Sequence, residues 1–195
     1  MDKQELIAFF RSLDRSFFID NENKKFADQD RPLPIGFGQT ISQPSLVLQM
    51  TYLMDLNPDS KVLEIGTGSG FQTAVLAQFA GTVYTIERIP ELAASARQKL
   101  EQLGYENIYY KVDDGSVGWS EHAPYDRIIV TAAAEKLPLD LIEQLSPGGR
   151  MLIPIGSAGF QELTLITRDQ QGEIHTSEAG GVTFVEMKGK YGWTR

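Results

Sequence analysis

The sequence predicts a doubly wound α/β domain whose mostly parallel sheet ends in an antiparallel pair of strands. Three observations carry this prediction. A strand-like run, VLEIG, leads into a glycine-rich loop and then into a helical repeat. Strand-like and helix-like segments alternate through the middle of the chain, as in parallel sheets built from βαβ units. After Gly156 two extended runs follow each other without a helical repeat between them, so they should pair antiparallel.

The elements can be placed in order along the chain. Helices are expected at residues 3–13 and near residues 46–54, on either side of an irregular charged segment. The parallel strands, which are short runs of apolar and β-branched residues, should cover residues 61–66, 82–87, 107–112, 126–132 and 150–156. The helices between them repeat apolar residues at spacings of three and four, and begin near Phe71, Glu91 and Leu137. The final extended runs are residues 162–168 and 180–187, joined by the turn DQQGE.

Length and composition indicate a single domain. The chain has 195 residues, of which 42% are hydrophobic, enough for one core. We expect N-terminal helices and a covering loop in residues 1–60, a cofactor-binding βαβ core in residues 61–156, and a β-rich part in residues 157–195. No signal-like start or long apolar run appears, so we expect a cytoplasmic protein without a membrane segment.

The charge and the reactive side chains narrow the function. A net charge of -8 argues against nucleic acid as a partner, because phosphates require clustered Lys and Arg. The tail KGKYGWTR is the most basic segment and is expected to be a solvated terminus. There is no cysteine, and the two histidines lack ligand spacing, so neither a thiolate nucleophile nor a metal site is expected. We expect a monomer.

The glycine loop predicts a nucleotide-type cofactor site. Gly66, Gly68 and Gly70 follow the first strand of the core, and Glu87 ends the next strand. Glycines let the backbone approach a ligand closely, and the following helix presents free N–H groups. A carboxylate at the end of the second strand can accept hydrogen bonds from both ribose hydroxyls.

The spacing within the loop favours S-adenosylmethionine. A dinucleotide fingerprint, G-x-G-x-x-G/A, needs a small residue where this chain has Phe71. The pattern here is G-x-G-x-G with Glu64 two residues before it, and an acid suits the ammonium group of S-adenosylmethionine. A dinucleotide site and a merely tight turn are the alternatives. Asp114 and Gly115 follow the third strand, where the carboxylate could accept the adenine amino group.

The end of the fourth strand favours an oxygen as the methyl acceptor. Enzymes that methylate exocyclic amines commonly carry Asn or Asp, two prolines and an aromatic residue there. This chain has Thr131, Ala132, Ala133 and Ala134, which leave room for a backbone but offer nothing that accepts an amine.

A second unusual segment precedes the core: RPLPIGFGQTISQP. Gly36 and Gly38 would let this loop fold over the cofactor, and Thr40 and Ser42 supply hydroxyls. Ser42 stands just before Gln43-Pro44 and a helix, so it is also suited to be a helix N-cap.

These segments together resemble the protein-L-isoaspartate (D-aspartate) O-methyltransferases. The resemblance covers about residues 13–187 and rests on motifs in the same order: RPLPIGFGQTISQP, VLEIGTGSGFQTAVLA, VYTIE, DDGSVGW, APYDRIIVTAAAEKLP, QLSPGGRMLIPIG and GGVTFVEM. It implies a Rossmann-like carboxyl methyltransferase that uses S-adenosyl-L-methionine and releases S-adenosyl-L-homocysteine. The substrate it implies is the α-carboxylate of L-isoaspartyl residues in damaged proteins and peptides, so the function would be protein repair.

The resemblance also assigns residues. Ser42 takes the position of the active-site hydroxyl, and the expected substrate contacts are Ser42, Thr131, Ala132 and Ala133. The expected cofactor contacts are Thr40, Ile41, Ser42, Glu64, Gly66, Thr67, Gly68, Ser69, Gly70, Glu87, Arg88, Asp114 and Gly115. The chain departs from the family pattern at Asp113, where Gly is usual, and at Glu186, where Pro is usual.

The expected chemistry is consistent with these residues. A carboxylate with a pKa near ~4 is already ionised at neutral pH, so it needs no general base to attack a methyl group. Ser42 would donate a hydrogen bond that orients this carboxylate. Two other functions remain open at this point: methylation of a different carboxylate or hydroxyl, and a non-catalytic domain that only binds S-adenosylmethionine.

Overall fold

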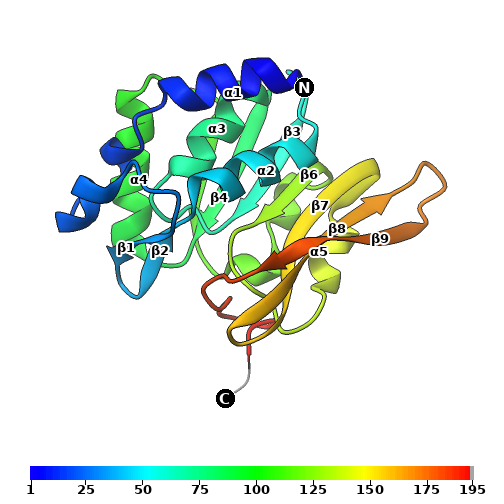
Figure 1. Ribbon diagram of the computed structural model, residues 1–195. Coiled ribbons are helices and arrows are strands. Elements are labelled where there is room, and N and C mark those ends of the chain that lie inside the picture. Colours follow the sequence, from blue (N-terminus) through cyan, green and yellow to red (C-terminus); the bar gives the residue numbers. More distant parts are fainter. Residues whose placement is uncertain (194–195) are drawn as a thin grey trace.

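A seven-stranded sheet forms the centre of the computed structural model, which describes residues 1–193 (Figure 1). The strand order is β5-β4-β3-β6-β7-β8-β9. The strands are Lys61–Ile65 (β3), Thr82–Glu87 (β4), Ile108–Val112 (β5), Tyr125–Val130 (β6), Leu145–Ser157 (β7), Phe160–Arg168 (β8) and Ile174–Val182 (β9). Neighbours from β5 to β7 pair parallel, and β8 pairs antiparallel with both β7 and β9. The predicted doubly wound fold is confirmed.

Helices cover both faces of this sheet. They are Lys3–Ser12 (α1), Pro44–Met54 (α2), Phe71–Phe79 (α3), Pro90–Gln102 (α4) and Leu139–Glu143 (α5). The connections place α3 and α4 on one face, where α2 packs against β7 and α1 lies over α2 and α3, and they place α5 on the other face (Figure 1). Short 3₁₀ helices connect them: Arg15–Phe18 (η1), Glu22–Phe26 (η2), Gly115–Val117 (η3) and Ser120–His122 (η4). Within residues 1–193 no helix has the length and apolar character that crossing a membrane requires.

Successive side chains of the central strands point to opposite faces of the sheet, so two hydrophobic cores form, one on each face. Val62 packs with the α1–α3 side, whereas the next residue, Leu63, packs with the α5 side, and both are fully buried. Ile129 and Ile128 of β6 divide in the same way. A strand that is apolar on both faces needs helices on both, which explains why β3 and β6 occupy the centre of the sheet.

The C-terminal strands differ from the prediction in one place. The run 162–168 lies within β8, but the second partner is β9, Ile174–Val182, and not residues 180–187. The antiparallel register joins Thr167 to His175 and Gln161 to Val182. Residues 183–187 leave the sheet because their backbone pairs with Ala133 at the end of β6 instead.

The proline- and glycine-rich segment forms a hairpin where a loop was predicted. Leu33–Gly36 (β1) pairs antiparallel with Gln39–Ile41 (β2), and the turn contains Gly36, Phe37 and Gly38, all with positive φ. The hairpin ends at Ile41, so Ser42 lies in the short link between β2 and α2.

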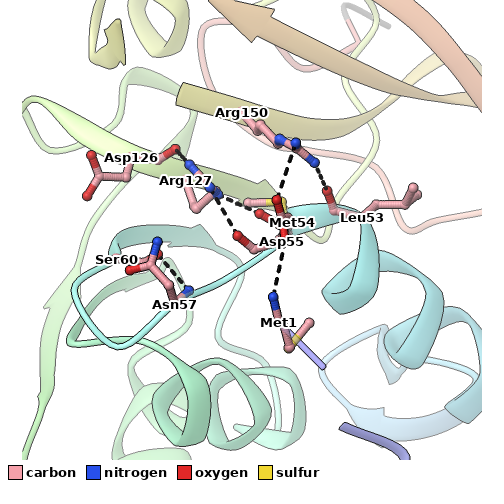
Figure 2. A network of polar contacts seen from close by, with 9 residues as sticks. All are labelled: Met1, Leu53, Met54, Asp55, Asn57, Ser60, Asp126, Arg127 and Arg150. Carbon is pink, nitrogen blue, oxygen red and sulfur yellow. Dashed lines mark hydrogen bonds and ion pairs between the residues drawn. The ribbon is translucent and has the colours of Figure 1, made fainter. Parts of the chain in front are cut away.

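The C-terminal end of α2 is tied to the sheet by two arginines (Figure 2). Arg127 of β6 donates to the carbonyl oxygens of Met54 and Asp55, and Arg150 of β7 donates to that of Leu53. Arg150 also forms an ion pair with Asp55 at 3.3 Å. Cations at a helix C-terminus satisfy carbonyls that have no partner within the helix, so the far end of α2 is fixed to β6 and β7.

Candidate active site

A cavity opens at the carboxyl ends of β4, β3 and β6, and the strand order reverses between β3 and β6; we call it the glycine-loop cavity. Its lining includes eight of the predicted site residues: Thr40, Gly66, Gly68, Glu87, Arg88, Gly115, Thr131 and Ala132. In doubly wound sheets, ligands bind at this topological switch point.

The loop after β3 approaches β6 so closely that only glycine fits. Gly66 has φ +95°, and a Cβ atom added there would lie 2.4 Å from Oγ1 of Thr131. That hydroxyl donates to the carbonyl oxygens of Ile65 and Gly66, at 3.0 and 2.7 Å. The end of β6 therefore holds the glycine loop from one side.

Glu87 holds the loop from the other side. Its carboxylate accepts hydrogen bonds from the N–H groups of Gly68 and Ile89, both at 2.9 Å, and the residue is 6% exposed. Four lone-pair positions are available on a carboxylate, so the two backbone donors leave room for further donors from a ligand. A buried acid that lines a cavity at the end of the second strand fits the ribose of an adenosyl group.

Behind the loop, a chain of hydroxyls leads to Glu64. Oγ1 of Thr67 lies 2.6 Å from Oγ1 of Thr85, which donates to Oε2 of Glu64 at 2.7 Å; Thr73 donates to the same oxygen at 2.6 Å. Glu64 is fully buried, and this desolvation raises its pKa to about 7 although the two hydroxyl donors oppose the shift. The sequence predicted a cofactor contact here, whereas the structure places Glu64 under the loop and outside the cavity lining.

The raised pKa of Glu64 predicts a pH-dependent stability. The native carboxyl keeps its proton up to about pH 7, while the unfolded chain releases it near 4.5. Between these values the native state binds more protons, so the free energy of unfolding falls as pH rises. Glu64→Gln should abolish up to about 3 kcal/mol of this decline, since one pKa unit corresponds to ~1.4 kcal/mol. Urea unfolding followed by circular dichroism at pH 5 and pH 8 measures the fall in the free energy of unfolding between these pH values. The exposed Glu91→Gln is the control. An equal fall in Glu64→Gln and in the parent would contradict the prediction.

At the end of β5, Gly115 lines the glycine-loop cavity, whereas Asp114 does not. Gly115 lines the cavity, and a Cβ atom there would lie 2.6 Å from Cγ2 of Ile65. The carboxylate of Asp114 accepts the N–H of Ser116 at 2.9 Å and so caps η3. Asp114 is half-buried and stands beside the cavity lining rather than in it.

The two departures from the family pattern lie in different places. Asp113 is exposed, forms an ion pair with Lys111 at 2.9 Å, and this partner lowers its pKa. Glu186 lines the glycine-loop cavity and forms an ion pair with Lys188. The unusual acid at position 113 is thus turned to the surface, while the one at position 186 belongs to the site.

The C-terminal segment closes one side of the cavity, which the sequence did not predict. The N–H of Ala133 donates to the carbonyl of Val185, and the N–H of Met187 donates to that of Ala133, both at 2.8 Å. This pairing brings four consecutive residues into the lining: Val185, Glu186, Met187 and Lys188. The only available signal was that GGVTFVEM is apolar and extended, which is equally typical of a strand.

The predicted solvated terminus is wrong for residues 191–193, whereas residues 188–190 are exposed as expected. Tyr191 is 7% exposed, and Nε1 of Trp193 donates to the carbonyl of Gly156 at 2.9 Å. Gly189 lies so close to Asp114 that an added Cβ atom would meet its carboxylate at 2.2 Å. The tail is held along the carboxyl ends of the strands; Thr194 and Arg195 lie outside the described residues.

A second hollow, which we call the hairpin groove, lies next to the cavity. It has a volume of about 580 Å³ and is lined by the end of the hairpin, the first turns of α2 and the end of β9. Its lining residues are Pro32, Thr40, Ser42, Gln43, Ser45, Leu46, Gln49, Phe160 and residues 179–184. Thr40 lines both hollows, so the groove and the cavity meet there.

None of these groove residues carries a formal charge. The polar groups are hydroxyls and side-chain amides, which can donate hydrogen bonds to an anion without offering a base. A carboxylate that enters the groove would therefore face hydroxyls and amides in the lining, and the lining contains no side chain suited to remove a proton.

Ser42 lies in the groove with its hydroxyl uncommitted. Within the part of the chain that the structure describes, no hydrogen bond involves Oγ of Ser42, although the residue is half-buried. The N-cap of α2 is Gln43, without a side-chain capping bond, and Pro44 at the first helical position needs no N–H partner. The expectation that Ser42 caps the helix is therefore wrong, and its hydroxyl remains available.

The other predicted residues support the site from behind. Ile41, Thr67, Ser69 and Ala133 are buried and lie outside the cavity lining, and Gly70 packs against α4. Their direct roles toward a cofactor or substrate stay predictions. Residues that line the cavity but were missed include Gln39, Ile65, Ile86 and Ser116. Ile65 is the last residue of β3 and Ile86 the last but one of β4, so the position of the strand ends was a usable signal for them.

Comparisons with known proteins agree with this geometry. Residues 1–192 match the family described as Protein-L-isoaspartate(D-aspartate) O-methyltransferase (PCMT). A protein-L-isoaspartate O-methyltransferase of Dictyoglomus turgidum is 51% identical over 97% of this chain and 86% of its own length. One of Geobacter metallireducens is 47% identical over 97% of this chain and 88% of its own length.

Solved structures show the same relationship. The structure of a protein described as a protein-L-isoaspartate O-methyltransferase from Plasmodium falciparum, in complex with S-adenosyl-L-homocysteine, aligns with a TM-score of 0.82 at 26% identity. The alignment covers 96% of this chain and 92% of that one. Over the same elements, the two proteins therefore share the fold and part of the sequence.

Proposed function

We propose, from the premise that this chain belongs to the protein-L-isoaspartate (D-aspartate) O-methyltransferase family, that it methylates L-isoaspartyl residues in damaged proteins and peptides. The resemblance seen in the sequence is thereby confirmed. The acceptor is the α-carboxylate of the isoaspartyl residue, and the methyl donor is S-adenosyl-L-methionine. The observation that carries the proposal is the meeting of the glycine-loop cavity with an uncharged groove at Thr40, beside the free hydroxyl of Ser42.

The glycine-loop cavity fits the cofactor. The close approach at Gly66 admits a ligand against backbone, and the buried carboxylate of Glu87 keeps acceptor capacity for ribose hydroxyls. Gly115 and Ser116 would face the adenine, and Thr131 and Ala132 the reacting end. When bound, S-adenosyl-L-methionine supplies a methyl carbon on a positively charged sulfur.

The protein's contribution to the reaction is alignment. The acceptor carboxylate is ionised at neutral pH, so no residue has to remove a proton. Ser42 would donate its hydroxyl to one carboxylate oxygen and so direct the other toward the cavity. Holding two reactants in line can be worth roughly 7–11 kcal/mol of the barrier. The hairpin and the tail would exclude water from the junction of the two hollows.

Labelling of a peptide pair tests the proposal. The protein is incubated with tritiated S-adenosyl-L-methionine and either an isoaspartyl peptide or its normal aspartyl twin. We expect base-labile label on the isoaspartyl peptide alone. Equal labelling of both peptides would indicate a less selective carboxyl methyltransferase, and calorimetric binding of S-adenosyl-L-homocysteine without labelling would indicate a non-catalytic binding domain; either result overturns the proposal.

The remaining properties are proposals as well. The net charge of -8 and the uncharged groove favour damaged polypeptides over nucleic acid as partners. We propose that the protein acts in the cytoplasm as a monomer and folds as one domain. Sedimentation velocity checks the oligomeric state.

A further inference from the structure

A buried arginine outside both hollows is bonded to the segment that carries Ser42. Arg15 of η1 is 6% exposed, and its guanidinium donates to four carbonyl oxygens. They are those of Ala27 at 3.0 Å, Gln29 at 3.1 Å, Arg31 at 2.8 Å and Ser42 at 3.1 Å. One side chain thus gathers the irregular segment after η2 and ends on the backbone of the proposed active-site residue.

A second contact joins the same segment to the start of α2. The carboxylate of Asp30 accepts the N–H of Ser45 at 2.8 Å and the side-chain amide of Gln43 at 3.1 Å. Asp30 therefore accepts one of the first-turn N–H groups of α2, which has no side-chain cap on its N-cap residue. Ser42 lies between these two sets of hydrogen bonds: Arg15 donates to its carbonyl oxygen, and Asp30 accepts from the two residues Gln43 and Ser45 that follow it.

We propose that Arg15 is a positioning residue for methyl transfer: it fixes the backbone of Ser42 so that its hydroxyl points into the hairpin groove. The inference rests on the proposed function, in which Ser42 orients the substrate carboxylate. Arg15 lines neither the cavity nor the groove and acts through the Ser42 carbonyl. A planar guanidinium can serve four acceptors in fixed directions, which the single ammonium group of lysine cannot do.

The chain offers a matched control at the other end of α2. Arg127 also donates to carbonyl oxygens, those of Met54, Asp55 and Asp126 (Figure 2). It holds the helix by the same chemistry but makes no contact with the link that carries Ser42. Arg15→Lys and Arg127→Lys should both lower the melting temperature, whereas only Arg15→Lys should disturb Ser42.

Kinetics on the two variants test the proposal. With an isoaspartyl peptide, below the melting transition of both, Arg15→Lys should lower kcat by about 10- to 100-fold, since a displacement of ~1 Å can cost ~100-fold. Its Kd for S-adenosyl-L-homocysteine should change much less, and Arg127→Lys should keep kcat within about twofold of the parent. Millimolar guanidinium should partly restore the kcat of Arg15→Ala. An unchanged kcat in Arg15→Lys, or equal losses in both lysine variants, would refute a positioning role.

Two further measurements keep the test decisive. If the Arg15 variants do not fold, the exposed Asp30→Asn loosens the same segment. This variant should lower kcat more than it lowers cofactor affinity, and an unchanged kcat in Asp30→Asn overturns the proposal.

Amide hydrogen exchange of residues 39–46 gives a readout independent of activity. Faster exchange in Arg15→Lys than in Arg127→Lys would support the link between Arg15 and Ser42. If the parent at the same time does not label the isoaspartyl peptide, the proposed function is overturned while this link stands. Equal exchange in the two variants would overturn that link.

Discussion

Replacement of Glu87 by alanine is expected to weaken the binding of S-adenosyl-L-homocysteine by about 100-fold or more. The carboxylate accepts the N–H groups of Gly68 and Ile89, so its loss releases the glycine loop and also removes the acceptor for the ribose. A hydrogen bond to a charged group contributes ~1.5–3 kcal/mol, and each ~1.4 kcal/mol is tenfold in affinity. Isothermal titration calorimetry measures the effect directly.

Two variants serve as controls for Glu87. Glu91 is an exposed acid in the first turn of α4, and Glu91→Ala should bind S-adenosyl-L-homocysteine like the parent. Glu87→Gln keeps one acceptor oxygen and should fall between the parent and Glu87→Ala. If Glu87→Ala, with an unchanged melting temperature, binds as tightly as the parent, the cofactor does not occupy the glycine-loop cavity in the proposed way.

Replacement of Ser42 by alanine should lower kcat for an isoaspartyl peptide by about 100-fold, the size of a ~1 Å misalignment of reacting groups. The hydroxyl has no partner among residues 1–193 and lines the groove beside Thr40, so it is free to hold the substrate carboxylate. Affinity for S-adenosyl-L-homocysteine should remain within a few-fold of the parent, because Ser42 lines the groove and not the cavity. Steady-state kinetics combined with calorimetry separates the two effects.

A neighbouring serine provides the control for Ser42. Ser45 lines the same groove but its hydroxyl already accepts from the side chain of Gln43 at 2.8 Å. Because Ser45 is exposed whereas Ser42 is half-buried, Ser45→Ala should lower kcat much less than Ser42→Ala. Similar kcat values for Ser42→Ala and the parent would show that another donor, such as Thr40, orients the carboxylate.

Sequence patterns were sufficient to predict those elements whose contacts lie close together in the sequence. The glycine loop, α3 and the acid that ends β4 lie within one βαβ unit, so the spacing from Gly66 to Glu87 placed them correctly. The same holds for the alternation of β3 to β7 and for the helices between them. For Glu64, spacing along the strand did not reveal that its side chain lies beneath the loop, where it accepts hydrogen bonds from Thr73 and Thr85.

Contacts between distant segments were not readable from the pattern. Residues 183–187 have the composition of a strand, yet their backbone pairs with Ala133, about 50 residues earlier. Because of this pairing, the second C-terminal strand covers residues 174–182 and not the predicted 180–187, and Val185 to Lys188 line the cavity. Ser42 shows the same limit: its sequence neighbours suggested a helix cap, whereas Gln43 occupies that position.

The sequence by itself therefore determined the doubly wound fold and the cofactor class, because these depend on short-range spacing between glycines, acids and strands, and its motifs identified the family by resemblance. Only the tertiary structure decided that the hairpin groove and the glycine-loop cavity meet at Thr40, that the tail closes the cavity, and that Arg15 is bonded to the carbonyl of Ser42. The physical reason is that these features are made by backbone groups. Carbonyl and N–H groups are the same at every non-proline residue, so their partners become visible only once the chain has folded.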